Sequence, residues 1–361
     1  MDLVLGVDAG GTASRAVVAT LTGEIVGRGA AGPGNPLSCG PDAAATIGLA
    51  VRTALTGHDP SRVVGGVLGV AGTSAAASPE VAAAFARMWA GLGLRCPMRL
   101  VGDVVTAFAA GTPAPSGRAL IAGTGAIAAR ITGHDITETA DGLGWLLGDE
   151  GSGRWIGLQA LRHTVRNWPA RPPNRITAPN RPAPPAELIT APNRPAPPAE
   201  LITAHDRPVP AAWRVGEPGW GLPAAVAAHA GAGSLSALIG WAQELPLADI
   251  DALAPLVCAL ARSGDPAACE IVAEAAAKLL STLDAVAPAH SDHAPADGGP
   301  VVLAGGLLAG DTPVRDHVLA ALRARRVPTG NGRDPAAAAA WLAARQLSPL
   351  TAAELHAALL P

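Results

Sequence analysis

The chain has 361 residues, which favours two domains, and 49% of them are hydrophobic, enough to build substantial cores. A formal net charge of −3 gives no basic surface of the kind that binds nucleic acid. Lys278 is the only lysine and no glycine loop precedes it, so a Walker A loop, which needs a Gly-Lys-Ser/Thr sequence, is excluded.

The N-terminal segment 3–20, LVLGVDAGGTASRAVVAT, predicts two strands joined by a turn that contains Gly10, Gly11 and Thr12. Consecutive backbone N–H groups in such a turn point into one concavity, which suits an oxyanion such as phosphate. Asp8 stands beside the turn and offers the carboxylate that a hydrated magnesium ion needs. This segment therefore predicts half of a site for phosphate and Mg²⁺.

The next segments predict a third strand at 24–28, a helix at 42–56, a buried strand at 63–72 and a helix at 79–92. Asn35 is the only amide in the Pro- and Gly-rich loop after the third strand. It could bind a polar ligand, and turn geometry accounts for it equally well. We place Asn35 and Thr73, which follows the buried strand, among the candidate substrate-binding residues.

Asp103 follows a predicted strand at 98–102 and begins a helix. The commoner use of Asp at such a place is to cap the helix. However, Asp103 comes at the carboxyl end of a buried strand, where α/β sheets bind ligands, and shortly before a second glycine turn. We therefore favour a general base, which would accept the proton of a hydroxyl group attacking phosphorus.

Residues 119–157 repeat the layout of strand, glycine turn and strand, with the turn at 123–125, and continue into a glycine-rich segment that carries Asp141, Asp149 and Glu150. Two such hairpins about a hundred residues apart predict two similar subdomains that face each other across a cleft. Each subdomain would contribute one phosphate-binding turn.

The remaining sequence predicts helices at 155–168 and between 222 and 283, and a strand that runs into Gly305 and Gly306. Adenine or ribose could lie against these paired glycines. ITAPNRPAPPAEL occurs at 176–188 and again at 189–201, and this proline content cannot form a helix or a central strand. We expect an extended surface insertion at 169–213, with a lid or a partner-binding arm as the alternative.

The four cysteines are scattered, which is typical of reduced residues in a cytoplasmic protein. No signal peptide and no uninterrupted apolar run of 18 residues is recognisable. We therefore expect a cytoplasmic protein that binds neither nucleic acid nor membranes. The sequence leaves the oligomeric state open, and a homodimer is compatible with it.

Four segments, DAGGT, GDVVTAF, GTG and GWLLGDEGSGRWIG, resemble the BadF-type ATPase and N-acetylglucosamine kinase branch of the actin, sugar-kinase and heat-shock ATPase superfamily. The resemblance covers nearly the whole chain apart from the insertion. It implies an α/β fold of two ribonuclease-H-like domains with ATP and sugar between them. The domains would be residues 1–115 with 346–361, and residues 116–345 with helical additions.

The family pattern also implies roles for individual residues. Asp103 matches the catalytic base. Asn35 and Asp149 match sugar-contacting positions, to which we add Thr73, Gly125 and Glu138. Contacts to phosphate or hydrated magnesium are implied for Asp8, Gly10, Gly11, Thr12, Thr124 and Gly125, and contacts to adenosine for Gly305 and Gly306.

The position after the GTG turn differs from the family pattern. N-acetylglucosamine kinases carry there an Asn that contacts the sugar, whereas this chain has Ile127. Glu138 and Asp141 follow nearby, and a desolvated carboxylate would favour a cationic 2-amino group through a charge-assisted hydrogen bond. The combination is similar to actinobacterial glucosamine kinases and predicts phosphorylation of D-glucosamine at its 6-hydroxyl. A solvated turn explains these two acids about equally well.

Three alternatives stay open at this stage. The substrate could be N-acetylglucosamine or another hexose. The chain could be an ATPase that drives a partner protein, as BadF relatives do, although such activators use a cysteine-held iron–sulfur cluster and these cysteines are scattered. It could also be a sugar sensor without catalytic activity.

Overall fold

The computed structural model describes residues 1–168, 221–244, 247–287 and 299–361, without the side chains of residues 73 and 74. The predicted Pro-rich insertion at 169–213 lies outside these residues. The contacts divide the described chain into two compact units, residues 1–152 with 273–361 and residues 153–272. The domain boundaries expected from the sequence stay a prediction.

The first sheet has five strands in the order β3-β2-β1-β4-β5. Neighbours β1, β2 and β3 pair antiparallel, whereas β4 and β5 extend the sheet parallel to β1. β1 is buried over almost its whole length, which explains its continuous apolar sequence. The strands are β1 (Leu3–Ala9), β2 (Ser14–Thr20), β3 (Ile25–Ala31), β4 (Val63–Val70) and β5 (Met98–Gly102).

The second sheet, in the same unit, has the order β10-β9-β6-β7-β8. Its β6, β7 and β8 pair antiparallel, and β9 and β10 extend the sheet parallel to β6, so the topology of the first sheet is repeated. The strands are β6 (Gly117–Ala122), β7 (Ala126–Thr132), β8 (Asp135–Asp141), β9 (Val301–Ala304) and β10 (Thr329–Gly332). The predicted α/β fold with two ribonuclease-H-like sheets is therefore confirmed.

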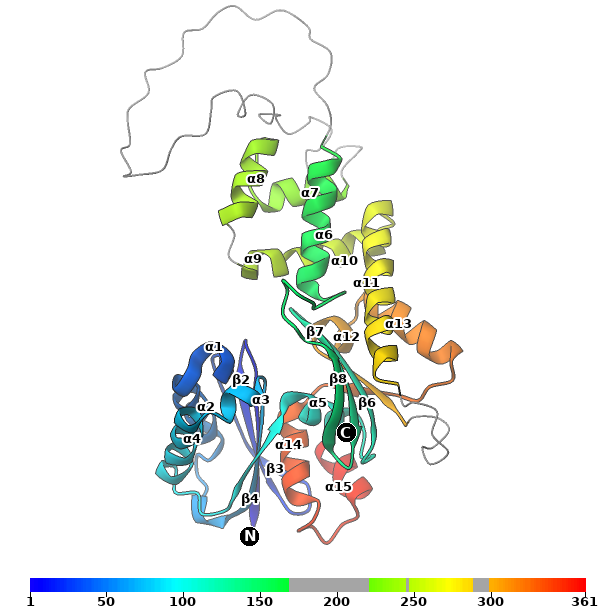
Figure 1. Ribbon diagram of the computed structural model, residues 1–361. Helices are drawn as coiled ribbons and strands as arrows, with labels where there is room; N and C mark the ends of the chain where they lie inside the picture. Colours follow the sequence, from blue (N-terminus) through cyan, green and yellow to red (C-terminus); the bar gives the residue numbers. More distant parts are fainter. Residues whose placement is uncertain (169–220, 245–246, 288–298) are drawn as a thin grey trace, which may run out of the picture. The chain divides into compact units, whose positions relative to one another are not determined.

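Two helices, α5 (Asp103–Gly111) and α14 (Pro335–Ala344), lie between the sheets and share one core with residues of both (Figure 1). Gly6 in β1 lies against the backbone of Ala336 and Ala340, so a Cβ atom at Gly6 would collide with α14. The alanine-rich sequence of α14 thus permits close packing on β1. This packing fixes the strand that carries Asp8.

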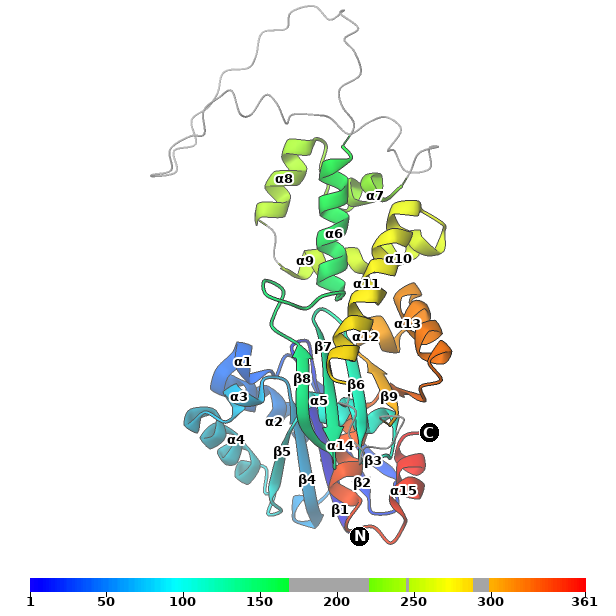
Figure 2. The same cartoon turned by 45° about the vertical axis from the view of Figure 1, so that its right-hand side comes forward.

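The other face of the first sheet is covered by α2 (Ala43–Ala54) and α4 (Pro79–Gly91), which bury Ile47, Phe85 and Trp89 against it. α15 (Ala352–Leu359) lies beside α14, and Trp341 Nε1 donates a 2.9 Å hydrogen bond to the Ala352 carbonyl (Figure 2). The unit also contains α1 (Pro36–Cys39), η1 (Gly40–Asp42), η2 (Pro60–Arg62), α3 (Thr73–Ala76), α12 (Gly306–Ala309) and α13 (Pro313–Ala324).

The second unit is helical. Its α6 (Gly153–Arg166) packs against α7 (Leu222–His229), α8 (Leu235–Glu244), α9 (Leu247–Asp251) and α10 (Leu253–Arg262). Arg154 donates two hydrogen bonds, of 2.8 and 2.7 Å, to the two carboxylate oxygens of Asp251. α11 (Pro266–Ala285) begins in the same unit. None of the helices in the described ranges is long and apolar enough to cross a membrane.

Candidate active site

The first glycine turn joins β1 to β2. Gly10 N–H donates to the Ala13 carbonyl and Gly34 N–H donates to the Gly10 carbonyl, both over 3.1 Å, so the turn is tied to the loop before α1. The exposed N–H groups of Gly11 and Thr12 donate no hydrogen bond to the described residues. A Cβ atom on Gly11 would have no atom within 4 Å. The turn therefore presents two unbonded amides to open space, as oxyanion binding requires.

Two carboxylates lie beside this turn at one edge of the first sheet. Asp8 is near the end of β1, and Asp103 begins α5 directly after β5. The strand between them, β4, places Gly69 opposite Asp8. A Cβ atom on Gly69 would lie 2.6 Å from Cγ2 of Thr106, so the glycine leaves the space that this side chain occupies. The absence of a side chain in β4 thus brings α5 close to Asp8.

Thr106 links the two acids. Its hydroxyl lies 3.2 Å from Oδ1 of Asp8 and 2.8 Å from the carbonyl oxygen of Asp103, and its single proton can be donated to either. Burial, with the nearby charge of Asp103, raises the pKa of Asp8 from 3.8 to about 7. Burial also raises the pKa of Asp103. Two half-buried carboxylates with raised pKa values form a site that a divalent cation would stabilise.

Asn35 lies at the start of α1, and its Oδ1 accepts a 2.8 Å hydrogen bond from Leu37 N–H. Its amide nitrogen makes no hydrogen bond within the described part of the chain and so can donate to a ligand. A Cβ atom on Gly72, which has φ +73°, would lie 3.2 Å from Asn35 Oδ1. Thr73 begins α3 next to Gly72, but its side chain lies outside the described part.

The second glycine turn joins β6 to β7, and Gly123 N–H donates to the Gly125 carbonyl over 2.9 Å. As in the first turn, the N–H groups of Thr124 and Gly125 donate no hydrogen bond to any described residue. The buried carboxylate of Asp149 lies against the turn, because its Oδ1 accepts a 3.1 Å hydrogen bond from Ala126 N–H. A Cβ atom on Gly125 would lie 3.0 Å from both carboxylate oxygens of Asp149. This glycine is therefore required for the acid to approach the turn.

Asp141 holds the segment that carries Asp149. Its two carboxylate oxygens accept hydrogen bonds of 2.6 and 2.9 Å from the N–H groups of Asp149 and Glu150. Asp141 and Asp149 have φ values of +63° and +56°, a strained conformation for residues other than glycine. A Cβ atom on Gly148 would collide with the carboxylate of Asp141. Asp141 thus acts as a clamp that positions Asp149.

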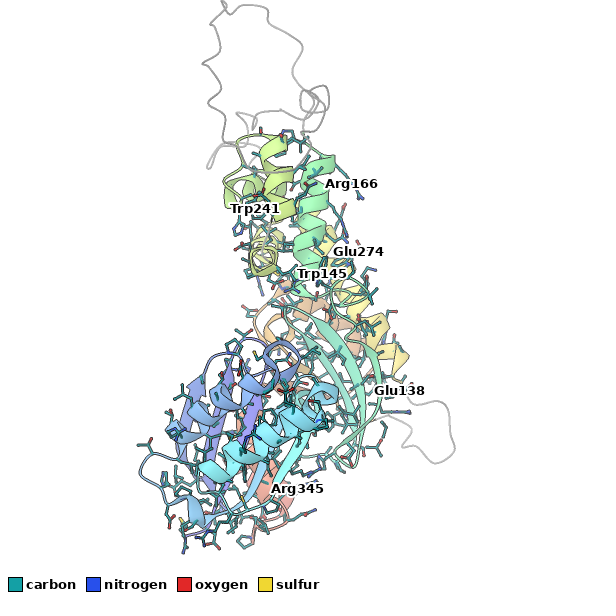
Figure 3. All side chains as sticks on the ribbon, turned by 60° about the vertical axis from the view of Figure 1, so that its left-hand side comes forward. Glu138, Trp145, Arg166, Trp241, Glu274 and Arg345 are labelled. Atoms are coloured by element: carbon teal, nitrogen blue, oxygen red, sulfur yellow. The ribbon has the colours of Figure 1, made fainter. Side chains whose placement is uncertain are left out.

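The loop between Asp141 and Asp149 exposes several large apolar side chains. Trp145 is 43% exposed, and Leu143, Leu146 and Leu147 are more exposed still. Figure 3 labels Trp145 in this loop, which follows β8, and Glu138 within β8. The clamp at Asp141 therefore fixes an apolar loop next to the second glycine turn.

Gly305 and Gly306 lie beside the same turn. Gly305 has φ +79°, and a Cβ atom there would collide with the Ala122 carbonyl, directly before the turn. A Cβ atom on Gly123 would lie 3.8 Å from the backbone nitrogen of Gly306. The predicted site residues thus form two groups in one unit. One group contains Asp8, the first turn, Asn35 and Asp103. The other group contains the second turn, Asp149 and the paired glycines.

The structure gives Glu138 a partner that the sequence did not suggest. Glu138 in β8 lies opposite Arg130 in β7, and the two form a 2.7 Å ion pair on the second sheet. Ile127 lies opposite Asp141 and packs against Gly142, whose Cβ atom would lie 2.8 Å from Ile127 Cδ1. An apolar side chain therefore lies beside the second glycine turn.

Three residues of the site were not predicted in their observed roles. Thr106 and the clamp formed by Asp141 depend on tertiary contacts that no local pattern reveals. Lys278, in α11, forms an ion pair with Glu150, and so the only lysine of the chain contacts the segment that carries Asp149.

Among the described residues, no group of three or more His, Cys, Asp or Glu side chains is placed to bind a metal ion. A cation here would rely on Asp8 and on ligand oxygens.

Comparison with known proteins decides the family. The model of the BadF/BadG/BcrA/BcrD ATPase family matches residues 5–325. The chain belongs to this family. The predicted relationship to it is therefore confirmed, and the repeated sheet topology agrees with it. No curated protein matches the chain significantly.

Solved structures show the same fold as this BadF-family chain. A candidate N-acetylglucosamine kinase from Chromobacterium violaceum has a TM-score of 0.62 at 24% identity, over 95% of this chain and 99% of its own. A second, from Porphyromonas gingivalis, has a TM-score of 0.55 at 17% identity, over 91% and 93%. A ROK family glucokinase from Streptomyces griseus has a TM-score of 0.50 at 18% identity, over 95% and 99%. The chain therefore has the two-sheet fold of sugar kinases.

Proposed function

We propose that this protein transfers the γ-phosphoryl group of ATP to the 6-hydroxyl of D-glucosamine, giving glucosamine 6-phosphate and ADP. The observation that carries the proposal is the pair Asp8 and Asp103, two half-buried carboxylates beside a glycine turn with unbonded amides. The membership of an ATPase family supports ATP as the phosphoryl donor. The cytoplasmic location expected from the sequence remains a prediction.

Asp103 would act as the general base. It begins α5 at the carboxyl end of β5, and burial raises the pKa of its carboxyl group, which makes the carboxylate a stronger proton acceptor. It would orient the 6-hydroxyl and accept its proton as the oxygen attacks phosphorus. Phosphoryl transfer depends mainly on positioning and charge stabilisation, so the unbonded amides of the two turns would contact the phosphate oxygens.

Asp8 would hold the magnesium ion that accompanies ATP. Its pKa of about 7 shows that the protein alone does not stabilise the ionised form, and a nearby cation would favour it. When bound, the ion would neutralise charge on the phosphate oxygens. Thr106 would keep Asp8 oriented through its hydroxyl group.

Asp149 is the better candidate for contact with the 2-amino group, because its carboxylate lies against the second glycine turn, whereas Glu138 lies in β8 opposite Arg130. The buried carboxylate of Asp149 lies beside Gly125, where it would accept a charge-assisted hydrogen bond from an ammonium group. Ile127 offers no hydrogen bond to an acetamido group. Asn35 would donate its free amide hydrogens to a sugar hydroxyl.

The substrate is tested by comparing kcat/KM for glucosamine, N-acetylglucosamine and glucose, with ³¹P NMR of the product to locate the phosphate. We expect glucosamine to be preferred. Ile127→Asn should raise the ratio of kcat/KM for N-acetylglucosamine to kcat/KM for glucosamine by about fivefold, which is the effect of one added hydrogen bond. Ile136→Asn, at an isoleucine of β8 that is 38% exposed, is the matched control and should leave the ratio unchanged. A native preference for N-acetylglucosamine would contradict the assigned substrate.

A second candidate function is an ATPase that drives a partner protein, and the ATPase part of it is supported by the family description. Such an enzyme would release ADP without any sugar. The absence of sugar dependence in the same assay would select this function over the kinase.

A further inference from the structure

A cavity of about 810 Å³ lies in the unit that contains both sheets, and its lining includes neither the glycine turns nor the two acids of the candidate active site. Its walls come from the start of β3, the end of α5, the segment after β10 and the C-terminal end of α15. The volume is typical of cavities that bind small molecules. None of the residues assigned to phosphate, sugar or adenosine lines it.

Asn331 contributes an amide side chain to the cavity lining. Its Oδ1 is buried from solvent, whereas its amide nitrogen makes no hydrogen bond to the described residues. The amide nitrogen can therefore donate a hydrogen bond to an oxygen of a ligand.

Two charged side chains of the lining are also unpaired. Arg28 donates a 2.8 Å hydrogen bond to Asp334, so these two compensate each other. By contrast, Arg333 and Glu24 form no ion pair within the described ranges. The cavity thus offers one free cationic and one free anionic side chain.

The remaining walls are aliphatic. Ile25, Leu359 and Leu360 contribute apolar surface, and no aromatic side chain of the described residues lines the cavity. A purine or pyrimidine base would therefore find no ring to stack on. A saturated ring with polar substituents fits these walls better than a nucleotide.

We propose that this cavity is a second ligand site that binds a phosphorylated amino sugar. Arg333 binds the phosphate, Glu24 binds the ammonium group and the amide nitrogen of Asn331 donates a hydrogen bond to a hydroxyl oxygen. The product of the proposed kinase reaction belongs to this chemical class. The site would therefore allow the protein to bind its product outside the site of phosphoryl transfer.

The test is isothermal titration of the full chain, without nucleotide, with glucosamine 6-phosphate, glucose 6-phosphate and inorganic phosphate. Because no ATP is present, the result does not depend on kinase activity. Arg333→Ser should weaken binding of glucosamine 6-phosphate by at least about tenfold, the effect of losing a charge-assisted hydrogen bond. Glu24→Gln should weaken the binding of glucosamine 6-phosphate and leave the affinity for glucose 6-phosphate unchanged.

Two further variants serve as controls. Arg323→Ser removes an exposed arginine that does not line the cavity, and Asp103→Asn alters the candidate active site. Both should retain this binding, and Arg333→Ser should retain the basal turnover. Loss of binding in Asp103→Asn with retention in Arg333→Ser would overturn the proposal, because the ligand would then occupy the active site. Equal affinity for inorganic phosphate and glucosamine 6-phosphate, or no binding at all, would also overturn it.

Discussion

Replacing Asp8 with asparagine should stabilise the magnesium-free protein at neutral pH and abolish ATP-dependent turnover. Burial and the charge of Asp103 raise the pKa of Asp8 to about 7 in the folded protein, whereas the value for an unstructured chain is 3.8. The folded state therefore favours the protonated carboxyl group. An asparagine has similar shape, needs no proton and can still accept the hydrogen bond from Thr106.

The sign of the pH effect follows from this difference. The stability contributed by protonated Asp8 is fully present below pH 3.8 and is lost as the pH rises through about 7. A rise in pKa from 3.8 to about 7 corresponds to about 4 kcal/mol, at 1.36 kcal/mol per pKa unit. The free energy of unfolding of Asp8→Asn should thus be similar to that of the native protein near pH 4 and larger by up to about 4 kcal/mol at pH 8.

Urea unfolding of both proteins from pH 4 to pH 8, in the presence of a chelator, measures this difference. Asp42→Asn is the control, because the Asp42 side chain forms no cap hydrogen bond at its helix end. Magnesium and ATP should reverse the order of stability, since only the native carboxylate favours the cation. Parallel pH profiles for native protein and Asp8→Asn would refute the raised pKa of Asp8, on which its assignment as a cation-binding carboxylate rests.

Three other substitutions separate fold from function. Gly11→Ala should change the free energy of unfolding by no more than about 0.5 kcal/mol, because the added Cβ has no neighbour within 4 Å. It should raise KM for ATP, because the proposed phosphate contact is at this turn. An unchanged KM would show that the first turn does not belong to the site. Gly6→Ala should destabilise the protein by about 3 kcal/mol in thermal unfolding, since its Cβ would collide with α14, and a neutral result would contradict the packing on β1. Asp141→Asn should lower the free energy of unfolding by about 1 to 3 kcal/mol and speed hydrogen exchange at the Asp149 and Glu150 amides, which donate to this carboxylate. Unchanged exchange would contradict the role of Asp141 as a clamp.

The parts of the fold and site that follow from local sequence were predictable. Each hairpin is two apolar strands around a glycine turn, and the unbonded amides of Gly11 and Thr124 occur where this pattern indicates phosphate binding. Asp8 and Asp103 meet because parallel strands present their carboxyl ends at one edge of a sheet. The local pattern of strands and turns was sufficient to indicate these features.

Other features depend on contacts between distant segments. Strands β8 and β10 carry polar and glycine-rich sequences, DITETAD and TGNG, which lack the apolar pattern of a strand and pair only because the second sheet provides edges. The ion pair of Glu138 with Arg130 follows from cross-strand register, which the sequence does not specify. Likewise, Thr106 reaches Asp8 because Gly69 leaves space in the intervening strand.

The central claim is that Asp103 activates a sugar hydroxyl for phosphoryl transfer. The most direct test is ADP release with ATP and magnesium, with and without glucosamine, for the native chain, Asp103→Asn and the Asp42→Asn control. We predict release that requires glucosamine, is retained in the control and falls by at least about 100-fold in Asp103→Asn. ADP release that is independent of every sugar, or full sugar-dependent activity in Asp103→Asn, would contradict the claim.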